Sequence, residues 1–314
     1  MSEETPAAKP SQPRLFPRHG EPVWRSTEII GRKPDLVHDF YYLLIAKSWR
    51  VLLTAFVVAF LGTNALFGGL YAIFGGVENA RPGSFVDGFF FSVETMGTIG
   101  YGEMTPHSNL AHGLVTVEAM LSLLGVAVVT GLVFAKFSRP QARVIFSDVA
   151  VVSPRNGVPT LMFRVANERA NHIAEAQLRA TLMGMEVTLE GERLRRMTDL
   201  PLVRNQSSAF ILTWTAMHVI NAQSPLFGAT PELLRQQQAE ILISFTGFDA
   251  TLSQTIHARH SYIADEIHWN ARFVDVLRTL PDGRRQVDYS KFHDTEPLPE
   301  ALLQTASTGT GGPS

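Results

Sequence analysis

The stretch "TMGTIGYGEM", residues 95–104, separates two long apolar runs of the chain. It places three glycines and a tyrosine where a hydrophobic segment would otherwise continue. Glycine weakens a helix, and backbone groups that face lipid have no hydrogen-bonding partner. Such backbone is tolerated at membrane depth only where protein encloses it or where it lines an aqueous cavity. The sequence therefore predicts a non-helical backbone segment with a functional role between two membrane-crossing segments.

Two apolar runs flank this stretch. The first, residues 51–74, contains no charged side chain, and as a helix it would be ~36 Å long, enough to cross a ~30 Å hydrocarbon core. A buried helix of a large soluble protein is the alternative, which an uncharged run of this length disfavours. The second run, residues 109–137, carries one acid, Glu118, which we expect to face protein or water. Its Gly125 and Gly131 permit close packing or bending.

The segment 83–96 has a helical pattern but at ~20 Å is too short to span the membrane. A short helix followed by glycine-rich backbone predicts a re-entrant loop. Basic residues precede the first span and follow the second, whereas the intervening loop has only Arg81. The positive-inside bias therefore predicts a plasma (inner) membrane protein with both termini in the cytoplasm. Residues 36–49 suit an amphipathic helix on the membrane surface, or alternatively the first turns of the spanning helix.

The backbone of residues 98–102 can supply ligands for an ion. An ion that crosses the bilayer must exchange its water shell for other oxygens, and backbone carbonyls provide these when they point to one side. Gly100 and Gly102 can adopt the conformations that this requires, and the Thr98 hydroxyl offers a further oxygen. Ile99 and Tyr101 would then point away and pack behind the strand. The sequence thus predicts an ion filter over these five residues.

The motif "TIGYG" resembles the signature of potassium-channel filters, and the order of span, short helix, signature and span matches the whole pore module of such channels. Further segments are similar to the prokaryotic inward-rectifier potassium channels, the KirBac family. They are "NARPGSFVDGFFFSVET", "GLVFAKFSRP", "LMFRVANERANHIAEAQLR", "WTAMHVINAQSPLFG" and "HARHSYIADEIHWNARFVD", and the resemblance covers residues 33–297. It implies a potassium-selective channel of four identical subunits, gated through its cytoplasmic domain. It implies neither enzymatic activity nor a cofactor or metal beyond the permeating K⁺.

The remainder of the chain reads as β structure. Residues 173–183 alternate in polarity, as expected of a half-buried strand. The residues expected on its apolar face are Ala174, Ala176, Leu178, Ala180 and Leu182. "RNG" at 155–157 and "PDG" at 281–283 predict hairpin turns. Many short strands predict a β-sandwich, and the resemblance implies an immunoglobulin-like one.

Composition excludes some functions. The net charge of −2 argues against a nucleic-acid partner, and the absence of cysteine excludes disulfides and thiolate metal sites. His257 and His260 are interpreted as structural in preference to metal-binding, because no further ligand motif lies near them. The expected organisation is a flexible tail at 1–32, an amphipathic interfacial (slide) helix at 33–47, a pore module at 48–138, a β-sandwich gating domain at 139–300 and a disordered tail at 301–314. Within the pore module we expect an outer helix at 48–76, a pore helix at 83–96, a filter at 98–102 and an inner helix at 109–138.

The resemblance also assigns roles within the pore. Glu94 and Glu103 bracket the filter, and a shared proton between them would support it, unless Glu103 is a solvated residue of the mouth. Phe134 matches the bulky residue that narrows the pore, with Gly125 or Gly131 as the hinge. Val126 stands where strongly rectifying relatives hold an acid, so we expect weak rectification. Glu118 either contributes to the field of the cavity or pairs behind the pore helix.

Five basic residues could bind anionic phospholipid head groups, unless they serve membrane topology alone. They are Lys47, Arg50, Lys136, Arg139 and Arg143. Two rival functions remain on the same scaffold. One is a nonselective cation channel, which Tyr101 within "GYG" disfavours, and the other is a membrane sensor that conducts nothing.

Overall fold

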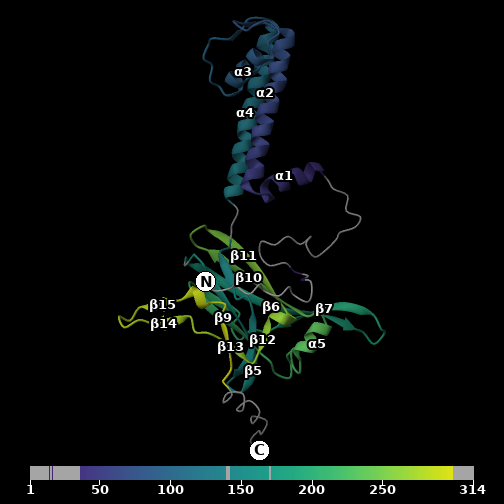
Figure 1. Ribbon diagram of the computed structural model, residues 1–314, viewed down its shortest axis with the longest axis vertical. Coiled ribbons are helices and arrows are strands. Elements are labelled where there is room, and N and C mark those ends of the chain that lie inside the picture. Colours follow the sequence, from purple (N-terminus) through teal and green to yellow (C-terminus); the bar gives the residue numbers. More distant parts are fainter. Residues whose placement is uncertain (1–13, 15, 17–35, 139–141, 170, 300–314) are drawn as a thin grey trace, which may run out of the picture. The chain divides into compact units, whose positions relative to one another are not determined.

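The structure is a computed structural model of the 314-residue chain, and it describes residues 14, 16, 36–138, 142–169 and 171–299. The chain divides into two compact units, one helical over 31–139 and one of β structure that includes residues 140–314 (Figure 1). The expected tail at 301–314 and most of the tail at 1–32 lie outside the described residues. Arg14 and Phe16 are described. The Arg14 guanidinium pairs with Glu266 and donates to the Ser261 carbonyl at 2.9 Å, a contact that the polar tail composition did not predict.

The described part of the helical unit contains α1 (Leu36–Ala46), α2 (Trp49–Phe74), α3 (Phe85–Met96) and α4 (Asn109–Phe137). The long helices α2 and α4 lie side by side, α3 packs against both at one end, and α1 lies at the other end (Figure 1). Strands β1 (Val77–Glu78) and β2 (Thr105–Pro106) pair and join the loops that flank α3 and the stretch after it. The unit therefore has the order of span, short helix, irregular stretch and span.

Helix ends follow local backbone chemistry. We expected an outer helix over 48–76, but α2 stops at Phe74 because Gly75 and Gly76 have φ of 65° and 82°. The pore helix expected from residue 83 begins at Phe85, since Ser84 is its N-cap. The expected inner helix at 109–138 ends at Phe137, and of the expected slide helix at 33–47 the structure describes Leu36–Ala46 as helix.

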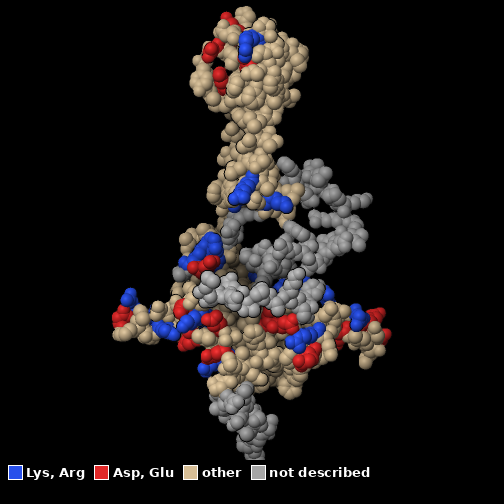
Figure 2. Space-filling view, in the orientation of Figure 1, with Lys and Arg blue, Asp and Glu red and all other residues tan. Residues whose placement is uncertain are grey.

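The two long helices have little protein around them. Only 22% of the most apolar window of α2 and 17% of that of α4 are buried within the chain. A core helix of a soluble protein would be mostly buried, so the alternative of a large soluble protein does not fit. Figure 2 shows an uncharged surface between the two ends of the helical unit, both of which carry charged side chains. Lipid or further subunits must therefore cover these apolar faces.

The described part of the β unit consists of two five-stranded sheets and short accessory strands. The first sheet has the order β11 (Gln254–Ile263), β10 (Glu240–Asp249), β6 (Ile173–Val187) and β7 (Arg193–Leu200), with β8 (Gln206–Phe210) pairing with β6. The second has the order β12 (Ile267–Trp269), β4 (Ala150–Arg155), β5 (Val158–Asn167) and β3 (Val144–Phe146), with β9 (Thr213–Val219) pairing with β5. The accessory pairs are β13 (Ala271–Phe273) with β16 (Thr295–Pro297) and β14 (Leu277–Thr279) with β15 (Arg285–Val287), and α5 spans Pro231–Gln236.

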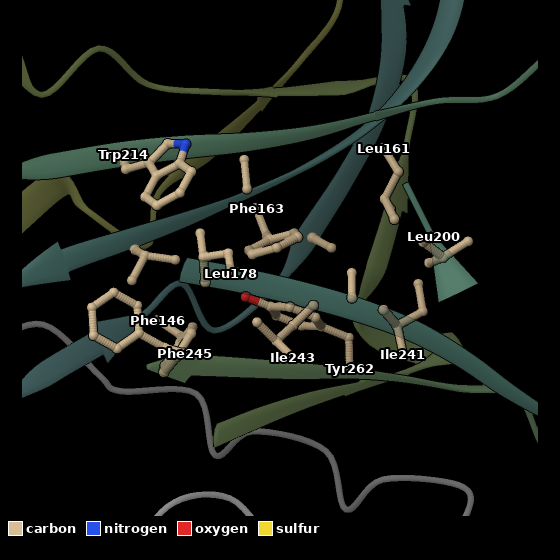
Figure 3. Packing of buried hydrophobic residues seen from close by; sticks show 14 of the residues in the cluster. Phe146, Leu161, Phe163, Leu178, Leu200, Trp214, Ile241, Ile243, Phe245 and Tyr262 are labelled. Carbon is tan, nitrogen blue, oxygen red and sulfur yellow. The ribbon is translucent and has the colours of Figure 1, made fainter. Parts of the chain in front are cut away.

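Both sheets contribute to one hydrophobic core, which makes the unit a β-sandwich. Phe163 of β5 and Trp214 of β9 meet Leu178 of β6, Ile243 of β10 and Tyr262 of β11, all nearly or fully buried (Figure 3). Side chains of both inner faces interdigitate, as expected of packed antiparallel sheets. The sandwich predicted from the many short strands is therefore present.

Both predicted hairpin turns are confirmed. Asn156 and Gly157 join β4 to β5 with φ of 51° and 77°, the pair of left-handed residues that a type I′ turn requires. Gly283, with φ of 83°, lies in the turn between β14 and β15. Asparagine and glycine adopt this conformation at little cost, so these residues predict the turn conformation directly.

The predicted alternation of residues 173–183 is wrong at its start. Ala176, Leu178 and Ala180 are buried as expected, but Ile173 is buried in place of Ala174. Glu175 has φ of 50°, and the pairing with β10 shifts register between Thr246 and Phe248. A β-bulge thus inserts one residue into β6, and one extra residue exchanges the two faces of a strand.

The histidines of β11 have structural contacts. His257 Nδ1 lies 3.2 Å from Thr246 Oγ1 on the neighbouring strand. His260 stacks on Phe146 with 5.2 Å between ring centroids. Three residues apart on a strand, the two rings point to opposite faces, so they cannot converge on one ion. The interpretation of both as structural is supported.

Candidate functional site

The short helix α3 is fixed at its N-terminus by side chains of its own loop. The Ser84 hydroxyl accepts a hydrogen bond from the Asp87 backbone N–H at 3.3 Å and so caps the first turn. Asp87 in turn accepts from the Arg81 backbone N–H at 2.8 Å and from its guanidinium Nη2 at 2.6 Å. These contacts fix where α3 begins. Because the helix is rigid, they also fix the position of its C-terminus, from which residues 97–102 follow.

Two glycines let α3 approach α2 closely. A Cβ built on Gly88 would lie 2.5 Å from the Gly68 carbonyl oxygen, and one built on Gly68 would lie 2.7 Å from the Phe89 Cα. Both obstacles are backbone atoms, which cannot move without shifting a helix. Glycine at these two positions therefore sets the distance between the helices, as small residues do in membrane helix packing.

The backbone of residues 98–102 alternates in handedness. Thr98, Gly100 and Gly102 have φ of 54°, 58° and 80°, whereas Ile99 and Tyr101 between them are not left-handed. Along an ordinary strand successive carbonyls point to opposite sides, and a left-handed residue at every second position cancels that reversal. In the described part of the chain no hydrogen bond reaches the carbonyl oxygens of residues 98–102. Within the described chain these carbonyls are thus free to serve as ligands for an ion.

The predicted packing of Ile99 and Tyr101 behind the strand is not found within one chain. Ile99 is 48% exposed and Tyr101 is 76% exposed. A tyrosine ring exposed to this extent next to a hydrophobic segment is typical of a surface that another molecule covers.

The acid of α4, Glu118, is fully buried behind α3. The Tyr71 hydroxyl donates to its Oε2 at 2.6 Å, and the Ser92 hydroxyl contacts its Oε1. Of the two expectations for Glu118, pairing behind α3 is confirmed, and a contribution to the field of the cavity stays a prediction. Sequence reasoning missed its partners, although an isolated polar residue in each apolar helix was the available signal.

Glu94 and Glu103, the pair predicted to support the filter, differ in their surroundings. Glu103 is exposed, and its backbone carbonyl accepts from the Asn79 side chain at 2.7 Å. Glu94 is half-buried in the last turn of α3, where its carbonyl accepts from the Ile99 N–H at 2.8 Å. A proton shared between their carboxylates stays a prediction.

Phe134 and Val126 lie on exposed parts of α4. Phe134 is 72% exposed and, at ~100° per residue, points away from the helix face that holds Glu118. Val126 is 62% exposed and lines a hollow of about 380 Å³ beneath Met96. The other wall residues of this hollow are mostly apolar and come from α2 and α4; they include Phe56, Phe60, Leu121 and Thr130. Among the described residues that line this hollow none is an acid, and the cavity position of Val126 stays a prediction.

The five basic residues proposed for lipid differ in their surroundings. The Lys136 ammonium donates to the backbone carbonyl of Lys47 at 2.6 Å and to those of Leu44 and Ile45 at 3.3 Å. An ammonium has three N–H donors, so all of them have partners at the C-terminal end of α1. Arg143 lies 3.4 Å from Glu168 in an exposed ion pair. Lys47 and Arg50 are exposed, and Arg139 lies outside the described residues. Lys136 therefore has intrachain partners at α1, and its contact with lipid stays a prediction.

Comparison with known proteins gives the same division of the chain. The "Inward rectifier potassium channel transmembrane domain" family matches residues 18–140, and the "Inward rectifier potassium channel C-terminal domain" family matches residues 144–309. The chain belongs to the inward rectifier potassium channel family. It is a membrane protein and a potassium channel, and channels of this family are multimeric.

Individual relatives agree with this assignment. "Inward rectifier potassium channel Kirbac3.1" of Paramagnetospirillum magnetotacticum is 49% identical over 263 residues, which cover 83% of this channel and 89% of the relative. "G protein-activated inward rectifier potassium channel 3" of Mus musculus is 34% identical over 284 residues, 83% of this channel and 72% of the relative. "ATP-sensitive inward rectifier potassium channel 15" of Homo sapiens is 29% identical over 326 residues, 96% and 86% of the two chains.

The close approach at Gly88 generates a first prediction. Gly88→Ala should lower the thermal midpoint of the purified channel in detergent, because the new methyl group overlaps the Gly68 carbonyl and overpacking of this kind costs ~1–3 kcal/mol. Gly113→Ala is the matched control, since its Cβ would meet nothing within 4 Å and alanine is the better helix former. Equal midpoints for Gly88→Ala and the unmodified channel would contradict the packing argument.

Proposed function

We propose that four copies of the chain form a potassium-selective pore, with the backbone of Thr98, Ile99, Gly100, Tyr101 and Gly102 from each copy lining the filter. The observation that carries this proposal is the alternation of left-handed residues over carbonyls that accept no hydrogen bond in the described chain. One chain supplies only one wall of a pore, and the exposed Tyr101 ring fits a site completed by neighbours. The permeating K⁺ is the only ion that the site is proposed to hold, and no further cofactor is proposed.

We further propose that the β unit is cytoplasmic, with both termini on the inner side of the plasma membrane. The exposed basic residues Lys47 and Arg50 at the α1 end of the helical unit support this orientation. The chain has no cysteine, so a single introduced cysteine near either terminus can be labelled without background. Labelling by a membrane-impermeant reagent in intact cells would contradict the orientation.

The same residues favour an effect of anionic phospholipid. Lys47, Arg50 and Arg139 are proposed to contact lipid head groups, whereas Lys136 fixes α1 to α4 and so transmits the position of α1 to the pore helix bundle. Potassium flux compared in vesicles with and without anionic phospholipid tests this proposal, and identical flux in both would remove it.

Rectification is proposed to be weak. Val126 provides no carboxylate, and Glu118 is held by Tyr71 and Ser92 with no exposed surface. A cavity without an acid offers magnesium or polyamines no strong site. Steep voltage-dependent block by internal magnesium would refute this proposal.

The filter assignment makes a direct prediction. Gly100→Ala should abolish potassium-selective flux into liposomes while the oligomer still elutes at its normal size, because alanine at a φ of 58° costs ~1–2 kcal/mol in each subunit. Gly69→Ala is a control, as its Cβ would meet nothing within 4 Å. Selective flux through Gly100→Ala would disprove the filter. Unselective flux through the unmodified protein would favour a nonselective cation channel, and absence of any flux would favour a sensor.

The gate makes a second prediction. Phe134 lies close to the C-terminal end of α4 with a freely exposed ring, and four such rings could close a pore because water leaves a narrow apolar constriction. Bending at Gly125 or Gly131 would open it. Phe134→Ala should raise resting potassium efflux from liposomes severalfold and leave the potassium-over-sodium ratio unchanged, since the filter is untouched. Unchanged efflux would place the closing point elsewhere, and a lost ratio would mean that Phe134 supports the filter.

A further inference from the structure

A cluster of polar side chains lies buried where α2, α3 and α4 meet. It comprises Asn64 and Tyr71 of α2, Ser92 of α3, and Glu118 and Ser122 of α4, and none of the five is more than 7% exposed. The helices that carry them are otherwise apolar at these faces. Buried polar groups in such surroundings cost free energy unless they are paired, so each contact in the cluster constrains the helices that it joins.

The contacts form two levels one helical turn apart. At the first level Glu118 contacts Ser92 and accepts from the Tyr71 hydroxyl at 2.6 Å. At the second level the Ser122 hydroxyl donates to the Met96 backbone carbonyl at 2.6 Å. Glu118 and Ser122 are four residues apart on α4, as are Ser92 and Met96 on α3. A sliding of α3 along α4 would therefore break both levels together.

Asn64 connects these levels to α2. Its side-chain oxygen accepts from the Ser92 hydroxyl at 2.9 Å, and its Nδ2 lies 2.7 Å from the Phe60 carbonyl and 3.4 Å from the Met96 sulfur. Met96 is the last residue of α3 and stands two residues before Thr98. The cluster thus ends at the point where the helix passes into the residues that supply the carbonyl ligands.

We infer that Glu118 is a positioning residue for ion selectivity, which holds α3 at a fixed height through Ser92 and Tyr71 and thereby sets the spacing of the filter carbonyls. This inference rests on the proposed filter at 98–102. Leucine would fill the volume of Glu118 and pack well against apolar helices, but it would let α3 settle at more than one height. A hydrogen-bonded acid holds α3 at a single height, because hydrogen bonds weaken steeply when their geometry is misaligned.

Two substitutions distinguish the hydrogen bonds of Glu118 from its charge. In Glu118→Gln the amide oxygen can still accept from Tyr71, and the amide nitrogen can donate to the Ser92 hydroxyl, which then donates to Asn64. In Glu118→Leu the hydroxyls of Tyr71 and Ser92 both lose this partner. The glutamine variant should therefore behave much as the unmodified channel does, and the leucine variant should not.

The experiment measures the potassium-over-sodium permeability ratio of the full-length channel in planar bilayers. We expect Glu118→Leu to lower the ratio tenfold or more and Glu118→Gln to keep it within about twofold. A purely structural role would reduce the amount of functional channel, and hence the current, without changing this ratio. Thr116→Val is the matched control on α4, because its exposed hydroxyl donates to the His112 carbonyl of its own helix at 2.8 Å and has no other hydrogen bond to the described residues.

A milder variant keeps the test decisive where the leucine variant does not fold. Tyr71→Phe removes only the hydroxyl and leaves the ring packed edge-on against Phe91 at 4.9 Å. It should lower the ratio severalfold, and its effect should not add to that of Glu118→Leu, because both remove the same contact. An unchanged ratio in Tyr71→Phe or in Glu118→Leu would overturn the inference, as would an equal loss in the glutamine and leucine variants. An unselective unmodified channel would instead refute the proposed filter.

Discussion

The helical unit depends on one constraint, which is that the irregular backbone of residues 98–102 must be held in place by the elements around it. The carbonyls of residues 98–102 accept no hydrogen bond in the described chain, and three of these residues are left-handed. Backbone in this state has no stabilisation of its own, so its neighbours must hold it. Three features hold α3, the helix that precedes this backbone, in position. They are its capped start, the contact of Gly68 with Gly88 and the cluster around Glu118.

Much of this could be predicted from the sequence because the signals are local. Absence of charge over residues 51–74 gives a span, "TIGYG" gives the alternating backbone, and "RNG" gives a left-handed turn. Contacts between elements have no such signal. Tyr71 and Glu118 are 47 residues apart, so periodicity within one helix does not predict their contact. The bulge at Glu175 appears in the pairing of β6 with β10, so periodicity within β6 alone does not predict it either.

Lys136 illustrates a different limit of sequence reasoning. A basic residue at the inner end of a spanning helix fits both lipid binding and topology, and charge alone cannot separate them. The structure adds a third use, because the ammonium meets three carbonyls at the end of α1 and lies 5.3 Å from the Trp49 ring centroid. Those carbonyls carry the negative end of the helix dipole, which attracts a cation without any lipid. Helices α1 and α4 are thereby joined within one chain.

The glycines of the helical unit fall into three groups that differ in why glycine is needed. Gly68 and Gly88 are required because backbone atoms lie where a Cβ would stand. Gly100 and Gly102 are required by their positive φ, although nothing lies within 4 Å of the added atom. Gly125 and Gly131 meet neither condition, since both are helical and face open space within the chain. Helical glycine without a packing partner costs ~1 kcal/mol relative to alanine, so what favours it here lies outside a single static subunit, in bending of α4 or in its contact with a neighbour.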